Sequence, residues 1–129
     1  MFLCKAEQFL DNNLKFLNFT KAMSVAALEA LKSNPNPNPK VGAALFDKNM
    51  KLKYKSHHVK KGEDHAEIDL IKKSNIQDTD YMYVTLEPCF HDDTSPSCVK
   101  ELLKTDIKNI VIGDIDSDPR TNGKSIDYL

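Results

Sequence analysis

Asparagine and proline alternate through residues 34–39, and this segment limits what the first part of the chain can form. Proline lacks a backbone N–H and disfavours helical backbone in the residue before it, so no regular helix can run through these positions. Before the segment, apolar residues recur at helical spacing, and residues 22–30 are rich in alanine. The pattern therefore predicts a helix from about Phe16 that ends near Ser33.

The rest of the chain alternates between strand-like and helix-like patterns. Val41–Phe46 and Lys51–His57 are separated by a turn-like sequence and predict a hairpin. Asp64 has the position and chemistry of an N-cap for the next helix. The other expected elements are helices over His65–Lys73 and Cys98–Thr105, strands over Tyr81–Leu86 and Asn109–Gly113, and a last helix from near Gly123. This order predicts an α/β fold, a three-layer α-β-α sandwich around a mixed sheet of four to five strands.

The length and charge of the chain bound its domain organisation and its partners. We expect residues 1–15 to be an N-terminal extension and residues 16–129 to be one domain. The net charge of −1, from 18 basic and 19 acidic side chains, argues against a nucleic-acid binder. Lysines crowd into residues 51–61, which we interpret as the solvated face of an edge strand, with a phosphate-binding patch as the alternative.

The cysteines and the lack of long apolar stretches indicate a cytoplasmic protein that does not enter a membrane. No apolar stretch approaches the roughly 20 residues that span a bilayer, and no signal peptide is evident. The three cysteines, Cys4, Cys89 and Cys98, do not suggest a disulfide framework. In a reducing compartment, such cysteines indicate metal ligands more readily than a disulfide bond.

The residues with the clearest chemistry stand at the predicted starts of two helices. His65 and Glu67 open one helix, Cys98 opens another, and Cys89 follows Glu87-Pro88 at the end of a strand. A catalytic zinc ion takes three protein ligands from His and Cys and keeps one position for water. Helix N-termini also favour thiolates, because their free N–H groups stabilise negative charge. The pattern predicts Zn²⁺ held by His65, Cys89 and Cys98, with Glu67 as the residue that moves the proton.

Each short motif alone is a weak signal, and two other interpretations stay open. His65 could be a satisfied buried histidine at a helix start. A purely structural zinc site would need a fourth protein ligand, which Cys4 could supply if the N-terminus folds back. The joint occurrence of His-x-Glu and two later cysteines, the first preceded by proline, favours a zinc deaminase.

At these residues the chain resembles the cytidine deaminase superfamily, over about residues 19–129. The resemblance rests on five stretches: Asn36–Gly42, His58–Glu67, Val84–Cys89, His91 with Ser95–Cys98, and Ile112-Gly113 with Asp118-Pro119. Eight residues separate Cys89 from Cys98, with His91 between them, whereas most of the superfamily has two residues there. This spacing is similar to that of the riboflavin-biosynthesis deaminase branch.

The resemblance implies a cytidine deaminase-like fold and a zinc-dependent deaminase domain over residues 16–129. The implied substrate is a small pyrimidine, the diaminohydroxyphosphoribosylaminopyrimidine intermediate of riboflavin biosynthesis, with Asn38, His58 and His91 in its pocket. A separate reductase is then expected in the pathway, and the superfamily commonly forms homo-oligomers.

One departure from the branch concerns the phosphate of this substrate. Thr94 stands where the branch often has a basic residue, and it follows Asp92 and Asp93, whose charge would repel a ribose phosphate. The lysine-rich stretch could compensate. The alternatives are a deaminase of another nucleobase, nucleoside or tRNA base, and a non-catalytic domain that zinc stabilises.

Overall fold

The computed structural model describes residues 13–34, 38–92 and 96–129, and the side chains from Phe19 onward. Four strands form one sheet: β1 (Gly42–Phe46), β2 (Leu52–His57), β3 (Tyr81–Val84) and β4 (Asn109–Ile112). The helices are α2 (Asn13–Leu31), α3 (Ala66–Lys73), α4 (Cys98–Leu103) and α5 (Lys124–Tyr128). None of the helices in the described part of the chain is long and apolar enough to cross a membrane.

The sheet is mixed, as expected. Its strand order is β2-β1-β3-β4. The β1 strand pairs antiparallel with both β2 and β3, while β4 runs parallel to β3. The parallel pair needs a crossover connection, and α4 provides it between β3 and β4.

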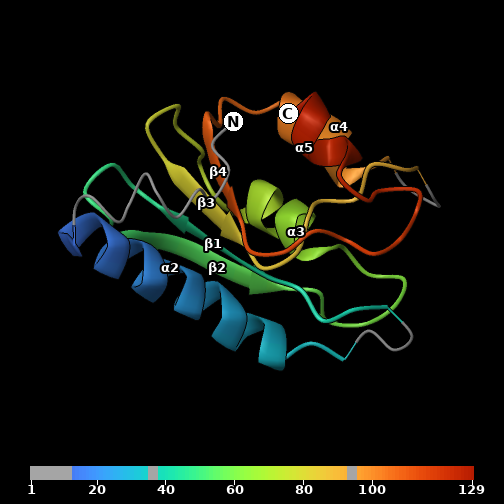
Figure 1. The fold of residues 1–129 in the computed structure, drawn as a ribbon, viewed down its shortest axis with the longest axis horizontal. Coiled ribbons are helices and arrows are strands. Elements are labelled where there is room, and N and C mark those ends of the chain that lie inside the picture. Colours follow the sequence, from blue (N-terminus) through green and yellow to red (C-terminus); the bar gives the residue numbers. More distant parts are fainter. Residues whose placement is uncertain (1–12, 35–37, 93–95) are drawn as a thin grey trace.

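Helices cover both faces of the sheet, which confirms the three-layer sandwich (Figure 1). On one face α2 packs through Ala22 and Ala26 onto Ala44, Phe46, Tyr83 and Val111. A Cβ atom on Gly42 would lie 1.9 Å from the carbonyl oxygen of Ala26, so only glycine permits this close approach of α2 to β1.

The other face of the sheet holds a larger apolar cluster. Leu45, Met82 and Ile110 from the strands pack against Leu70 of α3 and Leu102 of α4. Ile126 of α5 lies against the same cluster. The short helices α3, α4 and α5 therefore lie on the face opposite α2 (Figure 1).

The expected elements are present, but several of their limits differ. The prediction of Asp64 as N-cap was wrong: His65 occupies that position without a side-chain capping bond, while the Asp64 carboxylate pairs with Lys72 at 2.8 Å. The β3 strand ends at Val84 rather than Leu86, because Val84 is its last residue paired with β1 and β4. The first helix begins at Asn13 instead of Phe16, and most of the expected N-terminal extension lies outside the described residues.

The lysines of β2 lie on an edge strand, in agreement with the sequence-based interpretation. Lys53 binds the buried carboxylate of Asp80 at 2.6 Å, and Lys55 lies 3.5 Å from that of Glu29. These two lysines therefore pair with acidic side chains of this chain. Lys61 is not part of this strand, because it belongs to the loop between β2 and α3.

Candidate functional site

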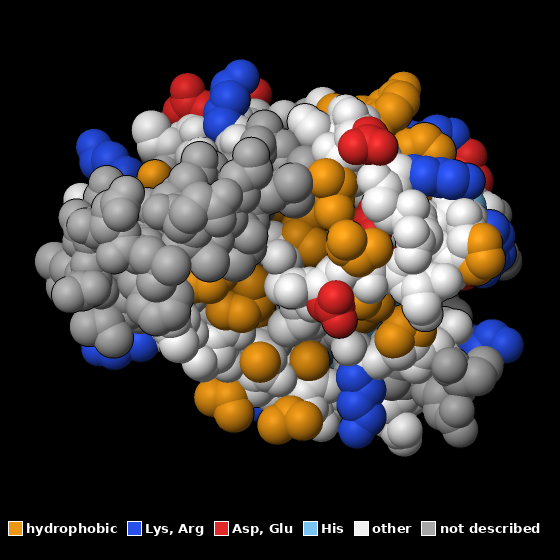
Figure 2. All heavy atoms as spheres, in the orientation of Figure 1, with side chains coloured by type: hydrophobic (Ala, Val, Ile, Leu, Met, Phe, Trp, Pro, Cys, Tyr) orange, Lys and Arg blue, Asp and Glu red, His pale blue; other side chains and the backbone are white. Residues whose placement is uncertain are grey.

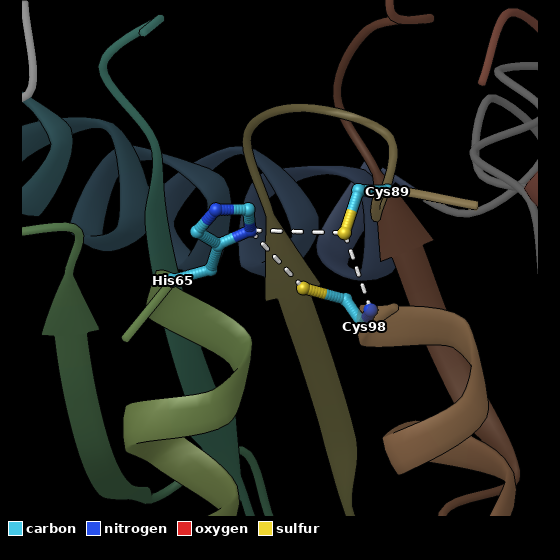
Figure 3. A group of neighbouring side chains, drawn as sticks. All are labelled: His65, Cys89 and Cys98. Carbon is cyan, nitrogen blue, oxygen red and sulfur yellow. Dashed lines mark hydrogen bonds between the residues drawn. The ribbon is translucent and has the colours of Figure 1, made fainter. Parts of the chain in front are cut away.

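Three side chains from separate elements converge where β3 ends and where α3 and α4 begin. The Nδ1 atom of His65 lies 3.7 Å from the Cys89 sulfur and 3.3 Å from the Cys98 sulfur. One ligand atom from each residue lies within 4.8 Å of the others. Figure 3 shows the three side chains pointing toward one another. The spacing of these nitrogen and sulfur atoms suits a single metal ion.

Local structure positions both cysteines. Ser97 caps α4 by accepting a hydrogen bond from the backbone N–H of Lys100, so Cys98 is the first residue of that helix. The backbone N–H of Cys98 donates to the Cys89 sulfur at 3.2 Å (Figure 3). The N-terminus of α4 thus stabilises negative charge on Cys89.

The two thiols differ in how readily they lose a proton. Hydrogen bonding to Cys98 and to His65 outweighs burial and lowers the pKa of Cys89 to about 4. The neighbouring Cys89 sulfur and burial raise the pKa of Cys98 well above its usual value. The pKa of His65 is raised, chiefly by its hydrogen bond with Cys89. A cation bound among these ligands would favour the thiolate form of Cys98.

Glu67 lies beside the three ligand-type residues, in the first turn of α3. Its side chain is buried, and one carboxylate oxygen lies 3.8 Å from the Cys98 sulfur. Burial raises the pKa of Glu67 to about 7. A carboxyl group with a pKa near neutrality can both accept and release a proton under physiological conditions.

The convergent residues face a cleft with two connected parts. The smaller part, about 130 Å³, is lined by residues that include Glu67, Leu86 and Asp116. The larger part, about 440 Å³, is lined by residues that include Lys61, Ile68 and Pro96. Both parts share the residues Asn38, His58, His65, Cys89 and His91. The structure therefore brings all seven site residues named from the sequence to one cleft.

Besides His65, two histidines line the cleft, and they are held by different partners. His58 is buried; its Nδ1 lies 2.9 Å from the Asp64 carbonyl oxygen, and its ring packs edge-on against His65. The Nδ1 atom of His91 lies 3.1 Å from the Thr121 hydroxyl. Both rings are thus fixed by hydrogen bonds on the nitrogen nearer the backbone.

Sequence reasoning assigned no role to the segment that supports the Cys89 loop. Glu87 is buried, and its carboxylate accepts hydrogen bonds from the backbone N–H groups of Asp116, Gly123 and Ser125. The Ser125 hydroxyl in turn donates to the Pro88 carbonyl. Residues 116–125 therefore clamp the loop that carries Cys89. The only sequence signal for this role was the Glu-Pro-Cys motif itself.

The charge of Asp92, which the sequence suggested would repel a phosphate, is paired within the protein. Asp92 accepts a hydrogen bond from the Ser97 backbone and pairs with Lys100, which offsets its charge. Lys61 lines the larger part of the cleft and forms no ion pair with any residue in the described ranges. Asp93, Thr94 and Cys4 lie outside those ranges.

Comparisons with known proteins agree with this arrangement. The family model for the cytidine and deoxycytidylate deaminase zinc-binding region matches residues 18–114. The diaminohydroxyphosphoribosylamino-pyrimidine deaminase of Buchnera aphidicola subsp. Schizaphis graminum is 34% identical over 111 residues, which cover 85% of this chain and 74% of the relative.

Two solved structures share the fold. RibD of Acinetobacter baumannii has a TM-score of 0.80 and 31% identity, covering 87% of this chain and 32% of that one. The Thermotoga maritima protein described as a diaminohydroxyphosphoribosylaminopyrimidine deaminase/5-amino-6-(5-phosphoribosylamino)uracil reductase has a TM-score of 0.78 and 30% identity, covering 86% and 33%. The present chain spans about a third of these two solved chains. It belongs to the cytidine and deoxycytidylate deaminase family, in the branch of the riboflavin-biosynthesis deaminases.

Proposed function

We propose that the protein is a zinc-dependent hydrolytic deaminase of an aminopyrimidine, the diaminohydroxyphosphoribosylaminopyrimidine intermediate of riboflavin biosynthesis. The convergence of His65, Cys89 and Cys98 beside the buried Glu67 carries this proposal. The printed activity of the Buchnera relative supports the choice of substrate.

The donor set fits zinc. One imidazole nitrogen and two sulfur atoms are the ligands that Zn²⁺ prefers, and the converging group has three members among the described residues. Three protein ligands leave the fourth position of a tetrahedral ion for water. When bound there, zinc would supply the activated water that attacks the amidine carbon of the ring.

Glu67 is the proton carrier in this proposal. Its carboxylate accepts a proton from the attacking water and delivers it to the ring nitrogen. It then accepts the second proton, from the hydroxyl added to the ring carbon, and delivers it to the amine, which departs as ammonia. Burial away from bulk water keeps the pKa of Glu67 at about 7, so one residue can perform both transfers. Asn38, His58 and His91 line the same cleft and are placed to bind the edge of the pyrimidine.

Lys61 is our candidate for the phosphate of this substrate. It lines the larger part of the cleft without an ion-pair partner among the described residues, so its charge is available to an anion. A reductase would act on the product, since the Thermotoga protein is described with both activities.

The direct test measures ammonia release and the mass change of the product across aminopyrimidines and aminopurines, each with and without ribose phosphate. We expect turnover of the phosphorylated diaminopyrimidinone only. Preferential turnover of adenosine within tRNA would replace this proposal with a nucleic-acid deaminase. On the face in Figure 2, the described Lys and Arg side chains stand apart around the edge, unlike the continuous basic surface of a nucleic-acid binder.

A Glu67→Gln variant separates catalysis from a purely structural zinc site. The amide keeps the size of the side chain but cannot carry the proton, so we expect retained zinc and a loss of ammonia release of about 10³-fold. Metal content is measured on the same preparation. Full activity in this variant would contradict the mechanism, while a wild-type protein that binds zinc without any turnover would indicate the non-catalytic alternative.

A further inference from the structure

The hydrogen bond of His58 determines which of its ring nitrogens carries the proton. Its Nδ1 lies 2.9 Å from the Asp64 carbonyl oxygen, and a carbonyl oxygen can only accept. In the neutral ring Nδ1 therefore donates, which leaves Nε2 as an acceptor. His58 is only 3% exposed, and Nε2 has no hydrogen-bond partner among the described residues. A buried acceptor without a partner is costly, so this nitrogen needs a donor that the described residues do not supply.

The hydrogen bonds of Thr121 determine which ring nitrogen of His91 carries the proton. The Thr121 side chain is fully buried, and its hydroxyl oxygen accepts the backbone N–H of Phe90 at 3.2 Å. Its other partner in the described structure is Nδ1 of His91, at 3.1 Å. The hydroxyl proton has no other acceptor among these residues. It therefore goes to Nδ1 of His91, and the ring proton resides on Nε2.

We propose that Thr121 is a positioning residue that fixes His91 as the Nε2–H tautomer, opposite to the Nδ1–H tautomer of His58. The cleft then offers one acceptor, from His58, and one donor, from His91. Such a pair selects a ligand edge that carries a donor and an acceptor together, as the N–H and C=O of a pyrimidinone lactam do. This choice of edge rests on the proposed function, whereas the tautomers themselves do not.

Long-range ¹H–¹⁵N correlation spectra of the zinc-loaded protein, labelled with ¹⁵N-histidine, read the tautomers directly. Spectra of His58→Gln and His91→Gln variants assign the two rings. We expect a protonated Nδ1 in His58 and a protonated Nε2 in His91. A protonated Nδ1 in His91 of the wild-type protein would overturn the proposal without any variant.

Two substitutions separate the tautomer effect from a loss of packing. Thr121→Val removes the hydroxyl with little change in shape, so we expect His91 to become a mixture of tautomers, while Thr121→Ser restores the wild-type spectrum. Ser125→Ala is the matched control, because it breaks a bond from the same segment to the Cys89 loop without touching His91. If Thr121→Val and Ser125→Ala change the His91 resonances equally, Thr121 has only a structural role.

Binding of pyrimidin-4(3H)-one and its N3-methyl derivative tests the expected ligand edge. Methylation removes the donor and leaves the His58 acceptor unpaired, so we expect roughly tenfold weaker binding to the wild-type protein. Thr121→Val should weaken the parent lactam by a similar factor. Equal binding of both compounds would contradict the lactam edge. Expected tautomers without ammonia release would refute the proposed function alone, and ammonia release with other tautomers would refute this inference alone.

Discussion

The two faces of the sheet differ in what their helices contribute. The α2 helix has 19 residues and covers one face through small side chains, whereas α3 and α4 have 8 and 6 residues and present His65 and Cys98 at their starts. None of the seven site residues belongs to α2. The long helix along the sheet contributes apolar packing to the core, while the short helices contribute the N-termini at which the reactive side chains stand. Changes on the α2 face should therefore affect stability, and changes on the other face should affect the reaction.

Removal of zinc tests this contrast with the largest expected effect. A chelator should abolish ammonia release completely, and added Zn²⁺ should restore it, because the three ligands lose the ion they share. Hydrogen exchange on the same samples should show faster exchange at the starts of α3 and α4, with α2 unchanged. Faster exchange throughout α2 would show that the two faces are not independent.

Gly42→Ala disturbs the packing of α2 on the sheet instead. The new Cβ would meet backbone atoms of α2, which cannot move away as a side chain can, so we expect a loss of about 3 kcal/mol in the free energy of unfolding. Urea denaturation measures it, and KM of the folded protein should be unchanged. Gly62→Ala is the control: it has a positive φ of 90° but nothing within 4 Å of the added Cβ, and it should cost only about 1 kcal/mol.

Lys61→Ala should change substrate binding and leave stability unaffected. Loss of this cation from the larger part of the cleft is expected to raise KM about tenfold for the phosphorylated substrate, with no change for its dephosphorylated form. Lys60→Ala is the matched control, since its ammonium pairs with Glu63. Equal effects of Lys61→Ala on both forms would exclude a role in binding the phosphate.

Glu29 provides the smallest expected effect, on the α2 side. Burial would raise its pKa, but hydrogen bonds from Lys32 and His57 and the charge of Lys55 outweigh it and lower the pKa. A carboxyl group whose pKa is lower in the folded state stabilises the protein fully at pH values above its pKa in the unfolded state, about 4.3. This stabilisation is lost as the pH falls through the pKa of the folded state. We expect about 1 kcal/mol from this source in urea titrations.

Glu29→Gln should flatten the dependence of stability on pH between about pH 3 and 5. Glu101→Gln on α4 is the matched control, because Glu101 pairs only with the exposed Lys104. An unchanged slope in Glu29→Gln would mean that other carboxylates cause the acid sensitivity.

Sequence patterns could predict the elements and the metal ligands because both depend on short-range signals. Helical spacing located α2, and the strand patterns located β1 and β2 to within one residue at either end. Of the three ligand-type residues, His65 and Cys98 stand at helix starts and Cys89 follows a proline after a strand, and in these places His-x-Glu and Pro-Cys are recognisable. The N-cap was missed because Asp64 has the right chemistry but instead uses its carboxylate to bind Lys72.

The clamp on the Cys89 loop could not be predicted for the opposite reason. The hydrogen-bond partners of Glu87 follow it by 29, 36 and 38 positions in the chain, and Thr121 lies 30 positions after His91. No periodicity or motif quoted from the sequence links these particular residues. Only the parallel pairing of β3 with β4 brings the segment after β4 beside the segment after β3.

This long-range clamp also fixes an order of events during synthesis. The β1–β2 hairpin can form as soon as its own residues have been made, because its pairing is local. The loop with Cys89 gains the partners of Glu87, Pro88 and Phe90 only after residues 116–125 have left the ribosome. The nascent chain therefore acquires a rigid form of the proposed metal pocket late, and a pulse of isotopically labelled zinc during translation should label mainly chains in which residue 125 has left the ribosome.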